Sequence, residues 1–225
     1  MEVINYKDYR FLQVCESPNI VISLKSEKQF CELDKEGKHD LLNQAFGVAA
    51  FNEFIQVHGT SIFNLDSSTK EYDGYIEREL NVANAIRTAD CIPLILWNAK
   101  NKLIIGLHCG WRGIASGIIE KALQNDEFSI THAYIGPHIS KDHFEVKKDF
   151  IESFQEYGLN INRFITARDD KMYMDLRSLC EAKLHEKHIK IINKESHCSY
   201  TECDQFFSWR RDKNQSLRNL TIAWF

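Results

Sequence analysis

Short apolar runs and helix-like periodic segments follow one another irregularly along the chain. Apolar runs bounded by turn-forming residues predict strands at 11–15, 20–24, 54–59, 92–97, 102–107, 132–137, 189–192 and 220–225. Apolar residues that recur three or four positions apart predict helices at 37–46, 114–123, 147–157 and 175–188. This irregular order favours an α+β fold with mixed, largely antiparallel sheets and flanking helices over a regular βαβ winding.

A hairpin at the centre of the chain brings two chemically active side chains together. Its apolar runs, 92–97 and 102–107, are separated by the turn-forming sequence Asn-Ala-Lys-Asn. If the last residue of the first run pairs with the first residue of the second, Cys91 lies directly opposite His108. Facing residues in such a pair have Cβ atoms about 4.5–5.5 Å apart. The hairpin therefore predicts a thiol and an imidazole on one sheet face.

The sequence that follows His108 has features of an anion site. Gly110 and Gly113 flank Arg112 just before the predicted helix at 114–123. Glycines let backbone N–H groups approach a ligand, and a helix N-terminus attracts anions. A buried thiol, a hydrogen-bonded histidine, a glycine turn and a surface salt bridge of Arg112 would explain each residue singly. Their combination favours a functional site.

Composition limits the classes of protein to consider. The 225 residues, 12% of them aromatic and without a linker-like stretch, predict one domain spanning 1–225. A net charge of −4 without a basic stripe gives no reason to expect nucleic acid or an anionic membrane as a partner. No apolar run is long enough to span a bilayer, and the start of the chain lacks a signal-peptide pattern. Seven cysteines without a framework spacing indicate reduced thiols, so we expect a cytoplasmic protein without an obligate protein partner.

Six motifs occur in order from Gln56 onward. They are Q-V-H-G at 56–59, T-A-D-C-I-P at 88–93, H-C-G-W-R-G at 108–113, I-G-P-H-I at 135–139, F-E-V at 144–146 and F-F-S-W-R-R at 206–211. In this combination the chain resembles the YfiH/YlmD family, also called the laccase-domain or multicopper polyphenol oxidoreductase family. The resemblance implies a layered α/β sandwich in a single domain. It also implies a metal site formed by His58, Cys91 and His108, and so adds a third ligand to the two that the hairpin brings together.

The same resemblance implies an enzyme of purine nucleosides. Family members are associated with phosphorolysis of adenosine or inosine and with deamination of adenosine, so the expected partners are a nucleoside and phosphate. Two imidazoles and one thiolate leave a fourth position open on tetrahedral zinc, as in catalytic rather than structural sites. Arg112, with the backbone of Gly110 and Gly113, is the candidate that would bind phosphate.

Two further positions near the motifs are candidate site residues. Asp90 precedes the expected ligand Cys91 and is interpreted either as a residue that orients the site or as a turn residue. Arg210 belongs to the basic pair Arg210-Arg211, which either closes over a substrate pocket or is simply solvated.

Two other functions remain open from the sequence. In a cysteine-type hydrolase, acting on a peptidoglycan precursor or another small molecule, Cys91 would be the nucleophile and His108 the general base. In a copper-dependent polyphenol oxidase the same three ligands would hold copper, which a His/His/Cys site accepts. Multicopper oxidation needs further histidine clusters, and the sequence contains no H-x-H pair. Zinc is therefore the preferred metal, with copper as the alternative.

Overall fold

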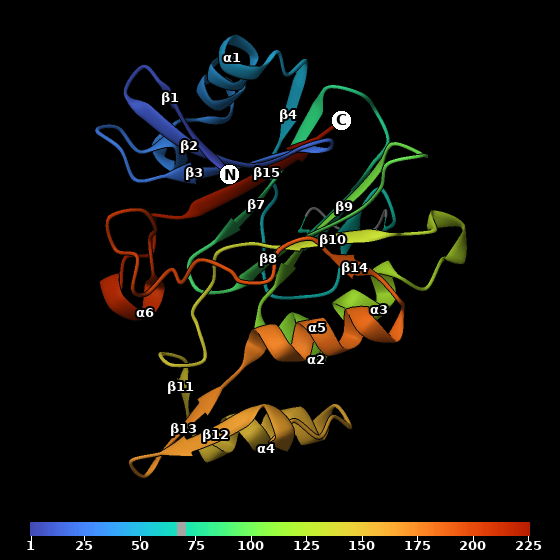
Figure 1. Ribbon diagram of the computed structural model, residues 1–225, viewed down its shortest axis with the longest axis vertical. Helices are drawn as coiled ribbons and strands as arrows, with labels where there is room; N and C mark the ends of the chain where they lie inside the picture. The colour runs from blue at the N-terminus through green and yellow to red at the C-terminus, as the bar shows by residue number, and fades with distance from the viewer. Residues whose placement is uncertain (67–70) are drawn as a thin grey trace.

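Two six-stranded sheets form the centre of the computed structural model, which describes residues 1–66 and 71–225 (Figure 1). The strands of the first sheet are, in spatial order, β1 (Glu2–Tyr6), β2 (Tyr9–Glu16), β3 (Asn19–Leu24), β15 (Asn219–Trp224), β7 (Val82–Thr88) and β4 (Ala50–Asn52). Those of the second are β14 (Lys190–Ile191), β10 (His132–Ile135), β8 (Ile92–Asn98), β9 (Leu103–Cys109), β6 (Gly74–Glu77) and β5 (Ile62–Phe63). Within the described residues, only the pairs β4–β7, β5–β6 and β10–β14 are parallel. The expected mixed, largely antiparallel fold is confirmed.

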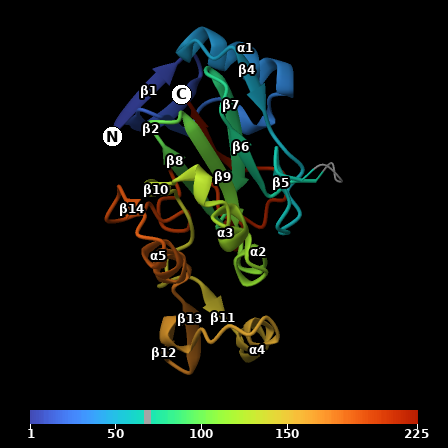
Figure 2. The same cartoon turned by 90° about the vertical axis from the view of Figure 1, so that its right-hand side faces the viewer.

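Apolar side chains fill the space between the two sheets and cover their outer faces. Ile22 and Ile86 of the first sheet pack in one cluster with Ile95 and Ile104 of the second. Helix α1 (Lys35–Phe46) covers the outer face of the first sheet through residues such as Leu42. Helices α2 (Trp111–Ala115), α3 (Ile118–Ala122) and α5 (Leu176–Glu186) cover the outer face of the second sheet. These four layers, visible in Figure 2, are the sandwich that the family resemblance implies.

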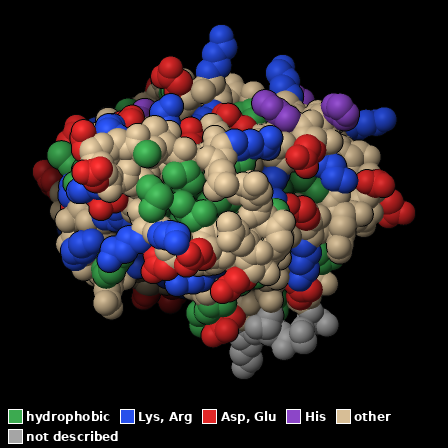
Figure 3. Space-filling view, turned by 90° about the horizontal axis from the view of Figure 1, so that it is seen from below, with side chains coloured by type: hydrophobic (Ala, Val, Ile, Leu, Met, Phe, Trp, Pro, Cys, Tyr) green, Lys and Arg blue, Asp and Glu red, His purple; other side chains and the backbone are tan. Residues whose placement is uncertain are grey.

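A small third sheet lies at the end of the molecule beyond α5 (Figures 1 and 2). Its strands are β11 (Glu145–Val146), β13 (Lys171–Met174) and β12 (Ile165–Arg168), and it is accompanied by α4 (Lys148–Glu156). Seen from this end, acidic and basic side chains are interspersed around a small hydrophobic area (Figure 3). The remaining short elements are η1 (Phe30–Glu32), η2 (Asp126–Phe128), η3 (Asn162–Phe164) and α6 (Trp209–Asp212). No helix in the described part of the chain combines the length and the apolar character needed to cross a membrane.

Two predicted elements differ from the structure. The helix expected at 114–123 is divided into α2 and α3, because Gly117 adopts a left-handed conformation with φ of +86° and ends the first helical segment. The strand expected at 54–59 is not formed; only Ile55 makes an isolated bridge, to Glu71. The backbone N–H groups of Val57, His58 and Gly59 in this segment donate instead to the carboxylate of Asp73.

The register of the central hairpin also differs from the prediction. His108 faces Pro93, and Trp97 faces Ile104, so the ladder is shifted by two residues. The loop begins one residue later than expected and includes Lys102, whose left-handed φ of +52° removes it from the strand. A shift of two residues preserves the alternation of faces. Cys91, just before β8, therefore still lies on the same side of the hairpin as His108, in a diagonal position.

Candidate metal centre

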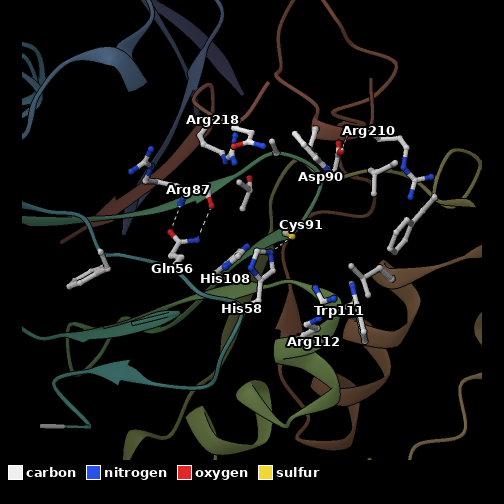
Figure 4. Close-up of a pocket in the computed structure, with 18 of the residues that line it drawn as sticks. Gln56, His58, Arg87, Asp90, Cys91, His108, Trp111, Arg112, Arg210 and Arg218 are labelled. Carbon is white, nitrogen blue, oxygen red and sulfur yellow. Dashed lines mark hydrogen bonds between the residues drawn. The ribbon is translucent and has the colours of Figure 1, made fainter. Parts of the chain in front are cut away.

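Three side chains from distant parts of the chain converge at one point (Figure 4). His58 comes from the loop before β5, Cys91 directly precedes β8, and His108 lies in β9. Their ligand atoms all lie within 4.8 Å of one another, and Cys91 Sγ is 3.7 Å from His58 Nε2. Nitrogen and sulfur ligands of tetrahedral zinc are about 3.5 Å apart, given bonds of about 2.0–2.3 Å. The spacing and the donor types therefore fit a metal ion.

The carboxylate of Asp73 organises this cluster from behind. It accepts the backbone N–H groups of Val57, His58 and Gly59 at 3.1, 2.9 and 2.7 Å, and so fixes His58 in its left-handed conformation (φ of +63°). The same carboxylate lies 2.8 Å from Nδ1 of His108 and is completely buried. With Nδ1 bound in this way, Nε2 of His108 is left to face the cluster. Sequence reasoning missed Asp73, for which the only signal was an Asp-Gly turn.

Charges within the cluster stabilise the thiolate form of Cys91. Burial disfavours that form, but the charge of His108 and hydrogen bonds with both histidines outweigh it and lower the pKa of Cys91 to about 6. Burial likewise disfavours the charged imidazole, yet the Cys91 thiolate and Asp73 raise the pKa of His108 to about 9. The pKa of Asp73 is lowered despite burial, because His108 and backbone N–H groups hydrogen-bond to it. A thiolate is the form of cysteine that binds a metal or attacks a substrate.

Gly110 is the residue that leaves room for the ligands. A Cβ atom at this position would lie 2.7 Å from Cδ2 of His58 and 3.2 Å from Sγ of Cys91. A Cβ atom on Gly113 would lie 3.1 Å from the carbonyl oxygen of Gly59. The two glycines therefore allow α2 to pack closely against the segment that carries His58.

The cluster opens into a cavity of about 770 Å³. Its walls are rich in arginine and aromatic side chains, namely Arg87, Arg112, Arg210, Arg218, Phe54, Trp111, Phe144 and Trp209. Asp90 is the one carboxylate among the described residues that line this space. A cavity of this size holds a small organic molecule. Because arginines outnumber carboxylates in its walls, we expect a ligand that is negatively charged or that binds together with an anion.

Residues 35–225, which include the whole cluster, match the family described as "Multi-copper polyphenol oxidoreductase laccase". The chain belongs to this family. A relative within it is the "Purine nucleoside phosphorylase YfiH" of Shigella flexneri, 29% identical over 174 residues that cover 75% of this chain and 71% of that protein. The YfiH resemblance inferred from the motifs is thereby confirmed.

Two further comparisons concern the sequence and the fold. A protein named "Adenosine deaminase RL5", from an unknown prokaryotic organism, is 29% identical over 165 residues, 69% of this chain and 63% of that protein. The crystal structure of Neisseria meningitidis protein NMB0706 has a TM-score of 0.77 at 22% identity and covers 95% of this chain and 98% of its own. The shared fold extends over nearly the whole length of both chains.

The other site residues expected from the family motifs lie around the same cavity. The Arg112 guanidinium stacks on the Trp111 ring at 4.5 Å, in the cavity wall next to the cluster. Both terminal nitrogens of Arg210 donate to the carbonyl oxygen of Glu145 at 3.1 Å, which fixes this side chain against the third sheet. The structure thus brings the two arginines to one cavity, each with a defined partner.

Asp90 holds the cavity wall in place and does not contact the ligand atoms. Its carboxylate accepts the hydroxyl of Ser199 at 2.7 Å and the backbone N–H of Arg210 at 2.6 Å. Its own carbonyl accepts the backbone N–H of Ile139 at 3.0 Å. Asp90 has a left-handed φ of +88°, which is uncommon outside glycine and is tolerated here by these bonds. It is therefore a turn residue that also positions the segment carrying Arg210.

Arg87 and Arg218 are cavity residues that sequence reasoning did not single out. Gln56 fixes the backbone of Arg87, accepting its N–H and donating to its carbonyl oxygen, both at 2.8 Å. A lone arginine in or beside a strand gives no sequence signal of its own, and the pairing of β7 with β15 is needed to bring the two together.

Proposed function

We propose that the chain is a zinc-dependent enzyme that cleaves adenosine and inosine with phosphate and also deaminates adenosine. The observation that carries this proposal is the His58–Cys91–His108 cluster at the base of a cavity lined with arginine and aromatic side chains. Relatives named purine nucleoside phosphorylase and adenosine deaminase support the same class of substrate.

His58, Cys91 and His108 would hold the metal, since their spacing and donor types fit one. A zinc ion bound by three protein ligands polarises substrate atoms and lowers the pKa of a bound water towards 7. Asp73 keeps His108 oriented with Nε2 towards the cluster. Gly110 keeps the space between Cys91 and His58 open.

The cavity walls would bind the two substrates. Trp111, Phe144 and Trp209 offer flat apolar surfaces for a purine ring. Arg112 and Arg210 add positive charge beside them. In phosphorolysis the bond between C1′ of the ribose and N9 of the base breaks, a phosphate oxygen bonds to C1′, and the base leaves with a proton. In deamination, water replaces the amino group of adenine, which leaves as ammonia.

A cysteine-type hydrolase is the second candidate. The specific observation in its favour is the lowered pKa of Cys91 beside the His108 imidazole, since this pairing activates thiol nucleophiles. A copper-dependent phenol oxidase ranks third. Within residues 1–66 and 71–225, His58, Cys91 and His108 form the one group of metal-ligand side chains, whereas multicopper oxidation needs several.

Product analysis tests the proposal. Protein loaded with zinc is incubated with adenosine or inosine, with and without phosphate, and the products are separated by chromatography. We expect free base and ribose 1-phosphate only when phosphate is present, and inosine from adenosine in its absence. Cys91→Ala should remove all three products, whereas Cys203→Ala, which changes an exposed thiol, should not. Intact nucleosides after incubation with the zinc-loaded wild type would overturn the proposal.

A further inference from the structure

Two arginines lie on one face of the first sheet, at the end of the sheet that borders the cavity. Arg87 in β7 pairs directly with Leu220 in β15. Arg218 lies two residues before Leu220, so by the alternation of side chains it is the diagonal neighbour of Arg87 on the same face. Both residues line the cavity that holds the His58–Cys91–His108 cluster (Figure 4).

The charges of this arginine pair have no acidic partner within the described residues. The guanidinium of Arg87 makes no hydrogen bond or ion pair to the described part of the protein, and its Nε atom is buried. Arg218 uses Nη1 to donate to the carbonyl oxygens of Asn214 and Leu217 at 3.3 and 2.7 Å, and makes no ion pair with a described carboxylate. Arg210, by contrast, is already bound to an acceptor, the carbonyl oxygen of Glu145.

The buried Nε atom of Arg87 has no hydrogen-bond partner among the described residues. Buried polar groups are normally satisfied, so an unpartnered one is evidence for a ligand or a water. Burial and the nearby charge of Arg87 lower the pKa of Arg218, which reflects the cost of placing two cations together.

We propose that Arg87 and Arg218 form a subsite for a phosphoryl oxyanion. An oxyanion would neutralise the two adjacent cations and occupy their free N–H groups, and guanidinium groups match the geometry of phosphate oxygens. This inference rests on the proposed function only in assuming that the oxyanion takes part in nucleoside cleavage. The oxyanion is either free inorganic phosphate or the 5′-phosphate of a nucleotide.

Kinetics with separate substrates distinguishes these two sources. Phosphate is titrated at saturating inosine, and AMP is tested as a substrate beside adenosine. For free phosphate, Arg87→Met and Arg218→Met should raise the KM for phosphate by about tenfold or more and shift adenosine turnover towards deamination by a similar factor. For a nucleotide, the same variants should lower kcat/KM for AMP by that factor and leave the KM for phosphate unchanged.

Conservative and remote variants make the test specific. Arg87→Lys keeps the charge and loses the planar fork, so it should give an intermediate effect. Arg163→Met changes an exposed arginine whose guanidinium stacks on Phe164 in η3, and should leave every constant as in the wild type. Equal loss of turnover with all substrates in both Arg→Met variants, without any change in phosphate KM or AMP preference, would overturn the subsite.

A binding measurement separates this subsite from the proposed function. Phosphate alone is titrated into the wild type and Arg87→Met, and its binding is followed as a rise in the midpoint of thermal unfolding. We expect a rise in the wild type that is lost in Arg87→Met. If that difference is found in a protein that leaves nucleosides intact, the subsite stands and the nucleoside activity fails. AMP is titrated in the same way, and the subsite is wrong if neither phosphate nor AMP raises the midpoint of the wild type more than that of Arg87→Met.

Discussion

Asp73 joins the two histidines of the cluster through a single buried carboxylate. Its Oδ2 atom accepts the backbone N–H groups of Val57 and Gly59, and its Oδ1 atom is shared by the backbone N–H of His58 and Nδ1 of His108. His58 and His108 are thus oriented by the same group. A residue that orients a metal ligand in this way commonly changes metal affinity by 10- to 100-fold when it is replaced.

The variant Asp73→Asn tests this role. An amide carries no negative charge and accepts through only one oxygen, so it cannot satisfy both sets of donors. We expect zinc affinity, measured by competition with a chromogenic chelator, to fall by about 10- to 100-fold. Asp66→Asn is the matched control, since Asp66 also accepts a backbone N–H, from Ile62, and binds a cation, Lys121, away from the cluster. Equal zinc affinities for Asp73→Asn and the wild type would show that Asp73 does not orient the ligands.

Gly110→Ala tests the space that the ligands require. The φ and ψ of Gly110, −69° and 156°, are ordinary for alanine, so the backbone itself tolerates the change. The added methyl group would lie 2.7 Å from the His58 ring, too close to persist, and 3.2 Å from Sγ of Cys91, so the His58 ring would have to shift. We expect zinc content, measured by elemental analysis, to fall well below that of the wild type while the circular dichroism spectrum is retained. A full complement of zinc would contradict this account of Gly110.

His138 links stability to pH independently of the metal centre. Its ring is 4% exposed and bonded to the carbonyl oxygen of Gly136, and burial lowers its pKa to about 4. The unfolded chain, with a pKa of about 6.5, binds the proton first, so the contribution of neutral His138 is complete above pH 6.5 and is lost as the pH falls towards 4.

The pH effect of His138 is measured as a difference from a variant. Urea unfolding of the wild type and His138→Asn at pH 7 and pH 5 should show an extra loss of about 2 kcal/mol in the wild type alone. Cys91 and His108 titrate in both proteins, so their effect on the free energy of unfolding cancels when the two proteins are compared. Parallel pH profiles for the two proteins would refute the buried, neutral state of His138.

At the scale of elements, Arg211 holds together the segment that forms one wall of the cavity. It donates to the carbonyl oxygens of Ser199, Tyr200 and Phe206 at 2.7 Å. The segment 198–212 carries Trp209 and Arg210 into the cavity. The two residues of the basic pair therefore have different roles. Arg211 stabilises the segment 198–212, and Arg210 lines the cavity.

Arg211→Ala should loosen this wall without removing the metal. Loss of the donors leaves carbonyl groups unsatisfied, at about 1–3 kcal/mol, which corresponds to a fall of roughly 2–12 °C in the unfolding midpoint. We also expect unchanged zinc content and faster cleavage by chymotrypsin within 198–212, mapped by mass spectrometry, since the aromatic cleavage sites of this segment are the same in the variant. Arg163→Ala serves as the control for loss of an exposed arginine. Wild-type cleavage rates and an unchanged midpoint would rule out this role of Arg211.

The elements show how far the hydrophobic pattern determines structure. Apolar runs predicted the central hairpin, and α1 ends at Gly47 as expected, with a left-handed φ of +72°. The register was wrong by two residues because nothing in the pattern shows that Lys102 turns left-handed. The third sheet was missed because β12 and β13 have only four residues each, too few to show the apolar alternation of a half-buried strand.

At the scale of the whole molecule, the site is assembled from segments that are distant in sequence. Hairpin alternation alone was sufficient to bring Cys91 and His108 together. His58 reaches them only because Asp73, on a separate segment, holds its backbone, and no local pattern encodes that contact. The family resemblance supplied His58, whereas Arg87 and Arg218 depend on the pairing of β7 with β15 and became visible only in the fold.

The central claim is that nucleoside cleavage depends on a metal held by His58, Cys91 and His108. The most direct test removes the metal by dialysis against a chelator, measures phosphorolysis of inosine, and then restores zinc or copper in separate samples. We predict no cleavage in the metal-free protein, recovery with about one zinc per chain, and no recovery in Cys91→Ala. Full activity in the metal-free protein, abolished when Cys91 is alkylated, would contradict the account and indicate a cysteine nucleophile instead.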